Sequence, residues 1–114
     1  MRYALLINER PGATDQLDER ERAAVTAEYM AFHDDPRVTA GERLQPAETA
    51  TTVRRADEEL LLTDGPFADT KEIFGGYFLV DAPDLDSALE LAGRVPALRF
   101  GGSVEVRPLA EIHR

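Results

Sequence analysis

The chain has 114 residues, of which 43% are hydrophobic and 31% charged, an ordinary composition for a soluble globular domain. A formal charge of −9 argues against binding to nucleic acid or anionic membranes, and the absence of cysteine excludes disulfides and thiolate chemistry. The length predicts one domain over residues 1–114. No long apolar run or basic leader is present, so we expect a cytoplasmic protein without a membrane span.

The first third of the chain predicts a strand and a helix. Residues 2–7 form a short apolar run, typical of a strand buried on both faces. A loop over 8–16 follows, and Asp18 with Glu21 has the spacing of a helix capping box. One face of that helix carries Val25, Tyr29 and Phe32. Pro36 should end it, because the residue before proline disfavours helical geometry.

The middle of the chain predicts strands. Residues 37–45 form a second strand that ends at Pro46, and 49–55 with 59–63 form a hairpin. Residues 73–80 are the clearest strand, although Gly75 and Gly76 interrupt its interior. Such a pair indicates a bulge or a close backbone approach.

The last third predicts a second helix and a final strand. Asp84 or Asp86 can cap the helix, whose apolar spacing involves Leu85, Ala88, Leu89 and Ala92. Gly93 and Pro96 end the helix. Residues 103–109 alternate, with Val104 and Val106 inward.

This order of elements predicts an α+β fold: a ferredoxin-like split βαβ pattern with one added hairpin. Two helices cover only one face of such a sheet. We therefore expect the other face to pack against a second copy in a homodimer.

Residues 63–97, TDGPFADTKEIFGGYFLVDAPDLDSALELAGRVPA, resemble the DGPF branch of the YCII-related proteins. The resemblance extends to RYALLI, GERLQP, TATTVR and GSVEVRP, and so covers most of the chain. It implies a dimeric α+β barrel, two ferredoxin-like subunits packed sheet to sheet. Members of this branch mostly lack an assigned reaction, and some are encoded with, or fused to, extracytoplasmic-function sigma factors.

The chain departs from the family pattern at two places. The YCII branch carries a histidine in the first helix and an aspartate before a proline near the end of the second, proposed as a catalytic pair. Here residues 22–29 contain no histidine, Val95 precedes Pro96, and His33 lies about two turns further along. The resemblance therefore does not transfer a His–Asp dyad. Family members also extend the first helix by a turn where this chain has residues 34–36.

Three residues are candidate catalytic groups. Asp64 either hydrogen-bonds its own turn or is aimed into a cavity by the rigid Gly65-Pro66 corner. Lys71 is the only lysine in the chain, and is either half of a surface ion pair or an amine with an adjustable pKa. Glu42 is a general acid or base if its strand turns it inward, and a surface residue if outward.

Four further residues are candidate ligand contacts: Glu72, Gly75, Tyr77 and His33. Glu72 is also the natural ion-pair partner of Lys71, and Gly75 leaves room for a ligand or for a neighbouring strand. A tyrosine placed like Tyr77 more often packs in the core than contacts a ligand. A histidine placed like His33 is more often a solvated cation at the end of a helix. No metal-ligand spacing and no nucleotide-binding motif occurs, so we predict no metal and no cofactor.

The sequence favours two functions over a third reading, a purely structural dimer without a pocket. The first is a cofactor-independent enzyme that acts on a small organic molecule, in which Glu42 or Asp64 moves a proton and Lys71 stabilises negative charge. The second is a non-catalytic homodimer that binds a small ligand or a sigma factor.

Overall fold

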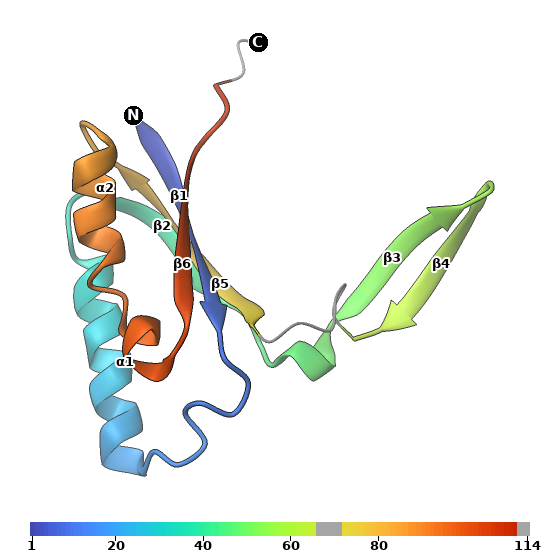
Figure 1. The fold of residues 1–114 in the computed structure, drawn as a ribbon, viewed down its shortest axis with the longest axis horizontal. Coiled ribbons are helices and arrows are strands. Elements are labelled where there is room, and N and C mark those ends of the chain that lie inside the picture. Colours follow the sequence, from blue (N-terminus) through green and yellow to red (C-terminus); the bar gives the residue numbers. More distant parts are fainter. Residues whose placement is uncertain (66–71, 112–114) are drawn as a thin grey trace.

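The computed structural model of the chain describes residues 1–65 and 72–111. Its main sheet is antiparallel, in the order β2-β5-β1-β6, and a two-stranded hairpin, β3-β4, stands apart (Figure 1). The sheet consists of β1 (Arg2–Glu9), β2 (Val38–Arg43), β5 (Ile73–Asp81) and β6 (Ser103–Pro108). The remaining elements are α1 (Glu19–His33), α2 (Leu85–Ala92), β3 (Thr51–Ala56), β4 (Glu59–Asp64) and the 3-10 turns η1 (Ala47–Thr49) and η2 (Pro96–Phe100). The predicted ferredoxin-like α+β fold with an added hairpin is confirmed.

Helix α1 begins and ends as the sequence predicts. The Glu21 amide donates to Asp18 Oδ1 at 2.8 Å, and the Asp18 amide donates to Glu21 Oε1 at 3.3 Å, which completes the capping box. At the other end the Asp34 amide donates to the carbonyl of Met30 at 3.2 Å. The chain then turns toward β2 at Pro36.

Helix α2 begins at the first of its two candidate caps, because the Ser87 amide donates to Asp84 Oδ1 at 2.9 Å. Its buried side chains are Ala88, Leu91 and Ala92. Leu85 and Leu89, which share the helical apolar spacing noted in the sequence, are each 48% exposed and lie outside the buried face. Both choices of face satisfy helical spacing, and packing against the sheet selects the one with Leu91.

The core lies between the sheet and the two helices, which cover the same face (Figure 1). Tyr3, Leu5 and Ile7 of β1 point into it, and Leu5 is completely buried. Ala4 and Leu6 alternate onto the opposite face, where they remain half-buried. The expectation that this strand is buried on both faces is therefore met on the helix side only. We call the uncovered side of the sheet the open face.

The sequence left open whether the glycine pair of β5 marks a bulge or a close backbone approach, and the structure shows both. Gly76 pairs with Ile7 and Phe74 pairs with Asn8, so Gly75 is the extra residue of a bulge. A Cβ atom at Gly76 would lie 2.8 Å from a backbone oxygen of β2, which shows the close approach of the two strands.

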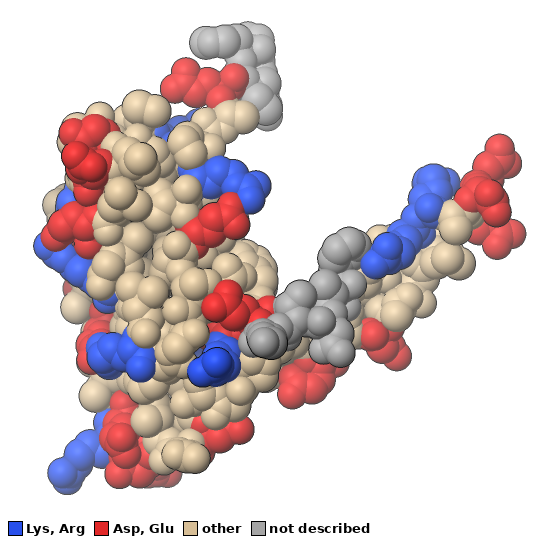
Figure 2. All heavy atoms as spheres, viewed as in Figure 1, with Lys and Arg blue, Asp and Glu red and all other residues tan. Residues whose placement is uncertain are grey.

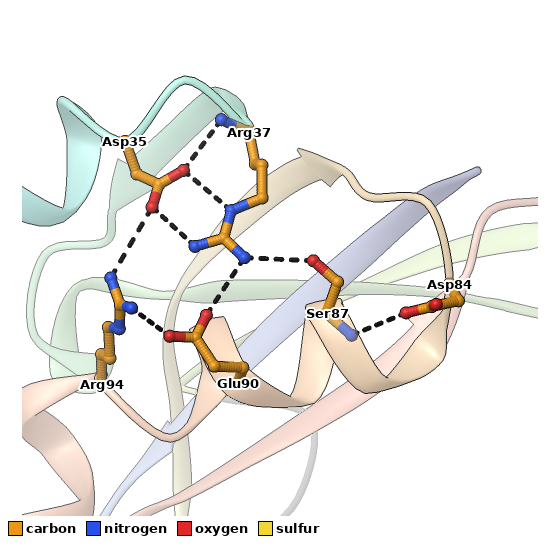
Figure 3. A network of polar contacts seen from close by, with 6 residues as sticks. All are labelled: Asp35, Arg37, Asp84, Ser87, Glu90 and Arg94. Carbon is orange, nitrogen blue, oxygen red and sulfur yellow. Dashed lines mark hydrogen bonds and ion pairs between the residues drawn. The ribbon is translucent and has the colours of Figure 1, made fainter.

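A polar network joins the turn after α1 to helix α2 (Figure 3). The Arg37 guanidinium donates to Asp35 at 2.8 and 3.0 Å and to Ser87 Oγ at 3.0 Å, and it pairs with Glu90 at 3.0 Å. Arg94 pairs with Glu90 and lies 3.7 Å from Asp35. This network lies just after α1, where the resemblance implies a further turn of the first helix.

The hairpin lies on the side of the sheet away from the helices (Figure 1). The radius of gyration is 16.1 Å, larger than the roughly 13 Å expected for a compact chain of this length. Among the described residues no helix is long and apolar enough to cross a membrane.

Candidate active site

A pocket of about 190 Å³ lies between helix α1 and the helix-side face of the sheet. We call it the α1 pocket. Its apolar wall includes Ile7, Tyr29, Met30 and Phe78. The Phe78 ring is central: it stacks with the Tyr29 ring at 6.3 Å between centroids and meets the His33 ring edge-on at 5.1 Å. Aromatic side chains held in this way form a rigid surface for a flat ligand.

Polar side chains from three elements line the same pocket. Glu9 comes from β1, Thr26 and His33 from α1, and Arg43 from β2. Burial raises the pKa of the Tyr29 phenol, and the negative charge of Glu9 raises it further, while Arg43 acts in the opposite direction. Tyr29 is therefore a neutral phenol at physiological pH, able to donate a hydrogen bond.

Two glycines make room for this arrangement. A Cβ atom at Gly41 would lie 2.3 Å from Cδ1 of Phe78, and one at Gly75 would lie 2.6 Å from the carboxyl carbon of Glu9. Both contacts are far shorter than van der Waals distance. Any larger residue at either position would displace a side chain that lines the pocket.

Comparison with known proteins establishes the family. The sequence profile of the YCII-related domain matches residues 1–113. The chain belongs to the YCII-related family. It is also 36% identical over 115 residues to the uncharacterized protein R00369 of Rhizobium meliloti (strain 1021), an alignment that covers 96% of this chain and 93% of that protein.

A solved structure shares the fold. It is the 5-chloro-2-hydroxyhydroquinone dehydrochlorinase TftG from Burkholderia phenoliruptrix AC1100, in complex with 2,5-dihydroxybenzoquinone. The TM-score is 0.51 with 17% sequence identity, and the match covers 96% of this chain and 94% of that one. At this identity the likeness extends to the fold alone.

Three of the residues predicted from the sequence border the α1 pocket of this YCII-related chain. His33 and Gly75 line it, and Glu42 borders it from β2. Glu42 pairs with Tyr77, which pairs with Leu6, so strand alternation directs the Glu42 side chain to the open face. The side of the strand that the sequence left undecided is therefore set by the pairing.

Two other predicted residues lie away from the α1 pocket. Tyr77 is half-buried on the open face. Glu72 is exposed and accepts a hydrogen bond from Ser103 Oγ at 2.8 Å, at the start of β6.

The structure does not bring Asp64 into the α1 pocket. It is the exposed last residue of β4, opposite Thr51 in the hairpin. The corner that follows it is held by the Gly65 amide, which donates to the carbonyl of Ala50 at 2.7 Å, and Gly65 has a φ of 98° that suits glycine. Lys71, like the Pro66 part of the corner, lies outside the described residues.

Glu9, Arg43 and the site role of Tyr29 were not predicted from the sequence. Tyr29 fits the apolar face of α1 and so is indistinguishable from a core residue by spacing alone. Glu9 and Arg43 come at or near strand ends with no motif around them. Within residues 1–65 and 72–111, no three His, Asp or Glu side chains gather as a metal site would require.

Proposed function

We propose that the chain is a cofactor-independent acid–base enzyme that acts on a small oxygen-bearing ring bound in the α1 pocket. The observation that carries this proposal is one cavity with an aromatic wall and convergent polar groups. Its volume of about 190 Å³ suits a single ring, since an engineered apolar cavity of about 150 Å³ takes benzene. Pockets for drug-sized ligands are larger, at about 300–1,000 Å³.

Four of the polar side chains at the pocket have a role in this mechanism. The ring of the substrate lies against Phe78, and Arg43 holds an acidic oxygen of the substrate by charge. His33 takes a proton from a substrate carbon or hydroxyl and returns it later, as imidazole does in general acid–base catalysis. Tyr29, kept neutral by its environment, donates a hydrogen bond to the oxygen on which negative charge develops. Glu9 favours the neutral form of Tyr29 by its own charge.

The structural neighbour supports the choice of ligand. TftG is named as a dehydrochlorinase of a hydroxylated ring, and its structure holds 2,5-dihydroxybenzoquinone. Such a molecule is flat, carries several oxygens and is of a size that the α1 pocket takes. It is a suitable first probe for this chain.

We also propose that the chain belongs to the DGPF branch and works in the cytoplasm as a homodimer joined through its open faces. The hollow between the sheets would then contain Glu42 and Tyr77 and form a second candidate site. Catalytic roles for Asp64, Lys71 and Glu42 belong to that alternative. Association with a sigma factor remains a prediction from the resemblance.

A matched pair of variants tests which site binds. The assay is titration of the dimeric chain with 2,5-dihydroxybenzoquinone, followed by the absorbance of the quinone. We expect Tyr29→Phe to weaken binding about ten- to hundredfold, the worth of one hydrogen bond to a charged group, and Tyr77→Phe to leave it unchanged. The reverse outcome, or an effect of Glu42→Gln in place of Tyr29→Phe, would move the site to the hollow between the sheets.

Catalysis is tested separately from binding. Once a substrate of this class is found, His33→Gln should lower kcat by roughly a hundredfold or more, with binding of the probe retained. The chain could instead bind the probe at the α1 pocket and turn over none of a panel of hydroxylated and chlorinated rings. It would then be a binding protein, and the proposal of catalysis would be refuted.

A further inference from the structure

The β3-β4 hairpin exposes more large apolar side chains than an isolated element should. Val53 is 57% exposed, Leu60 60%, Leu61 47% and Leu62 69%. All residues of β4 are exposed, and in β3 only Thr52 is partly covered. A two-stranded hairpin alone in water is marginally stable at best, so these side chains need a covering surface.

Strand pairing sorts these residues onto two sides. Val53 is opposite Leu62 and Arg55 is opposite Leu60, which places these four on one side of the hairpin. We call Val53, Leu60 and Leu62 the leucine face. Leu61 pairs with Arg54 and points to the other side.

The hairpin leaves the body of the molecule on the side of the open face (Figure 1). The chain measures 46 × 45 × 19 Å, a flat shape in which sheet and hairpin form two arms of an angle. One arm of this angle is the sheet, whose open face is uncovered. The other arm is the hairpin, which is also uncovered. A body that fills the angle would cover both.

We propose that this body is a second copy of the chain, and that the leucine face of each hairpin packs against the partner subunit as a clasp. The inference rests on the homodimer proposed above, and adds the hairpin to its interface. In this dimer each copy supplies one open face and one hairpin, as two-fold symmetry requires.

The area of the open face bears on the clasp. The sheet has four strands about 4.8 Å apart, each of six to nine residues at about 3.3 Å, which gives roughly 450 Å² in projection. A stable interface buries about 800 Å² of accessible surface on each partner, a measure that includes the relief of the side chains and therefore exceeds the projected area. The leucine face would add apolar surface to that of the open face.

Charge favours the same partner. Two copies with a charge of −9 each repel one another, and the open face adds Glu42 to the surface that would be buried. Glu105 lies on the same face but is paired with Arg107 beside it.

On the hairpin, Arg55 shares the leucine face and would approach such a surface, whereas Arg54 is on the other side. The acids of the hairpin are residues 57–59 at the far tip and Asp64 at the base. Figure 2 shows basic atoms on the far half of the hairpin, with acidic atoms at its tip and also near its base. Arg55 on the leucine face thus complements a partner of net negative charge.

Substitutions on the two sides of β4 test the clasp. The dimer dissociation constant is measured by analytical ultracentrifugation for the parent, for Leu60→Ser with Leu62→Ser, and for Leu61→Ser as the matched control. We expect the double variant to weaken the dimer tenfold or more, about 1.4 kcal/mol, and the control to change it less than threefold. Circular dichroism checks that both variants keep the fold.

The outcomes separate the clasp from the dimer. If the parent is a dimer and the double variant dimerises equally well, the clasp is wrong and the homodimer stands. If Leu61→Ser weakens the dimer as much as the double variant, the assignment of the leucine face is wrong. If the parent is a monomer at 100-fold dilution and at high concentration alike, both proposals fail.

Hydrogen exchange tests the clasp in the unaltered chain. The amides of β3 and β4 should exchange more slowly above the dimer dissociation constant than below it, because docking prevents the hairpin from opening. Exchange that does not depend on concentration in these two strands would overturn the proposal.

Discussion

Replacing Asp35 by Asn should destabilise the fold, because Asp35 anchors the network in Figure 3. Its carboxylate accepts from the Arg37 amide at 2.9 Å and from the Arg37 guanidinium at 3.0 and 2.8 Å, and its side chain is only 15% exposed. The cost lies between that of an exposed ion pair, about 0–1 kcal/mol, and that of a broken buried pair, about 3–5 kcal/mol. We expect a loss of about 1.5–2 kcal/mol in the free energy of unfolding and a fall of about 8 °C in Tm.

The effect should depend on pH with a definite sign. The hydrogen bonds from Arg37 lower the pKa of Asp35 from its ordinary 3.8 to about 2. The folded pKa is below the unfolded one, so Asp35 contributes its stability fully above about pH 4 and loses it as the pH falls through about 2. The shift corresponds to at most roughly 2.4 kcal/mol before solvent screening is allowed for, in line with the loss expected for the Asn variant.

Urea unfolding of the parent and of Asp35→Asn, at pH 7 and in steps from pH 4 to pH 2, measures both effects at one chain concentration. The control is Asp34→Asn, which removes the same charge from the neighbouring exposed residue. We expect a gap between parent and Asp35→Asn at pH 7 that closes toward pH 2, and almost none for the control. A gap that persists at pH 2, or an equal loss in the control, would refute the role given to the carboxylate.

Two further substitutions test the α1 pocket. Gly41→Ala should lower the free energy of unfolding by about 1–3 kcal/mol and weaken binding of 2,5-dihydroxybenzoquinone, because its methyl group would lie 2.3 Å from Phe78. The control is Gly93→Ala, whose methyl group would have no neighbour closer than 3.5 Å. Both variants are compared by urea unfolding and by titration with the quinone. Equal midpoints for the two variants would show that the strand adjusts without cost. Glu9→Gln should lower the pKa of Tyr29, since the Glu9 charge contributes to raising it, as an absorbance titration of the phenol would show. An unchanged titration would mean that the Glu9 charge does not raise the pKa of the phenol.

Local patterns in the sequence predicted much of this protein. The capping box at Asp18, the end of α1 near Pro36 and the turn between residues 56 and 59 depend on neighbours within a few positions, where backbone preferences act directly. The glycine pair of β5 likewise predicted a bulge or a close backbone approach, and the structure has both. The order of these elements was sufficient for the fold class, since few topologies satisfy it.

The candidate site could be predicted only in part. His33, Gly75 and Glu42 border the α1 pocket, whereas Asp64 and Tyr77 lie elsewhere on the described chain. Asp64 was predicted as a site residue because it belongs to the DGPF motif. A motif does not specify the direction in which the hairpin that carries it leaves the sheet.

What the sequence by itself determined is therefore the set of elements and their ends, because those depend on interactions between residues close along the chain. Only the tertiary structure decided that Leu91 and not Leu89 enters the core, that Glu42 turns to the open face, and that Tyr29 and Glu9 meet at one pocket. The physical reason is that these outcomes depend on strand register and on the packing of a helix against a sheet. Both bring together residues far apart in sequence, and no local preference specifies them.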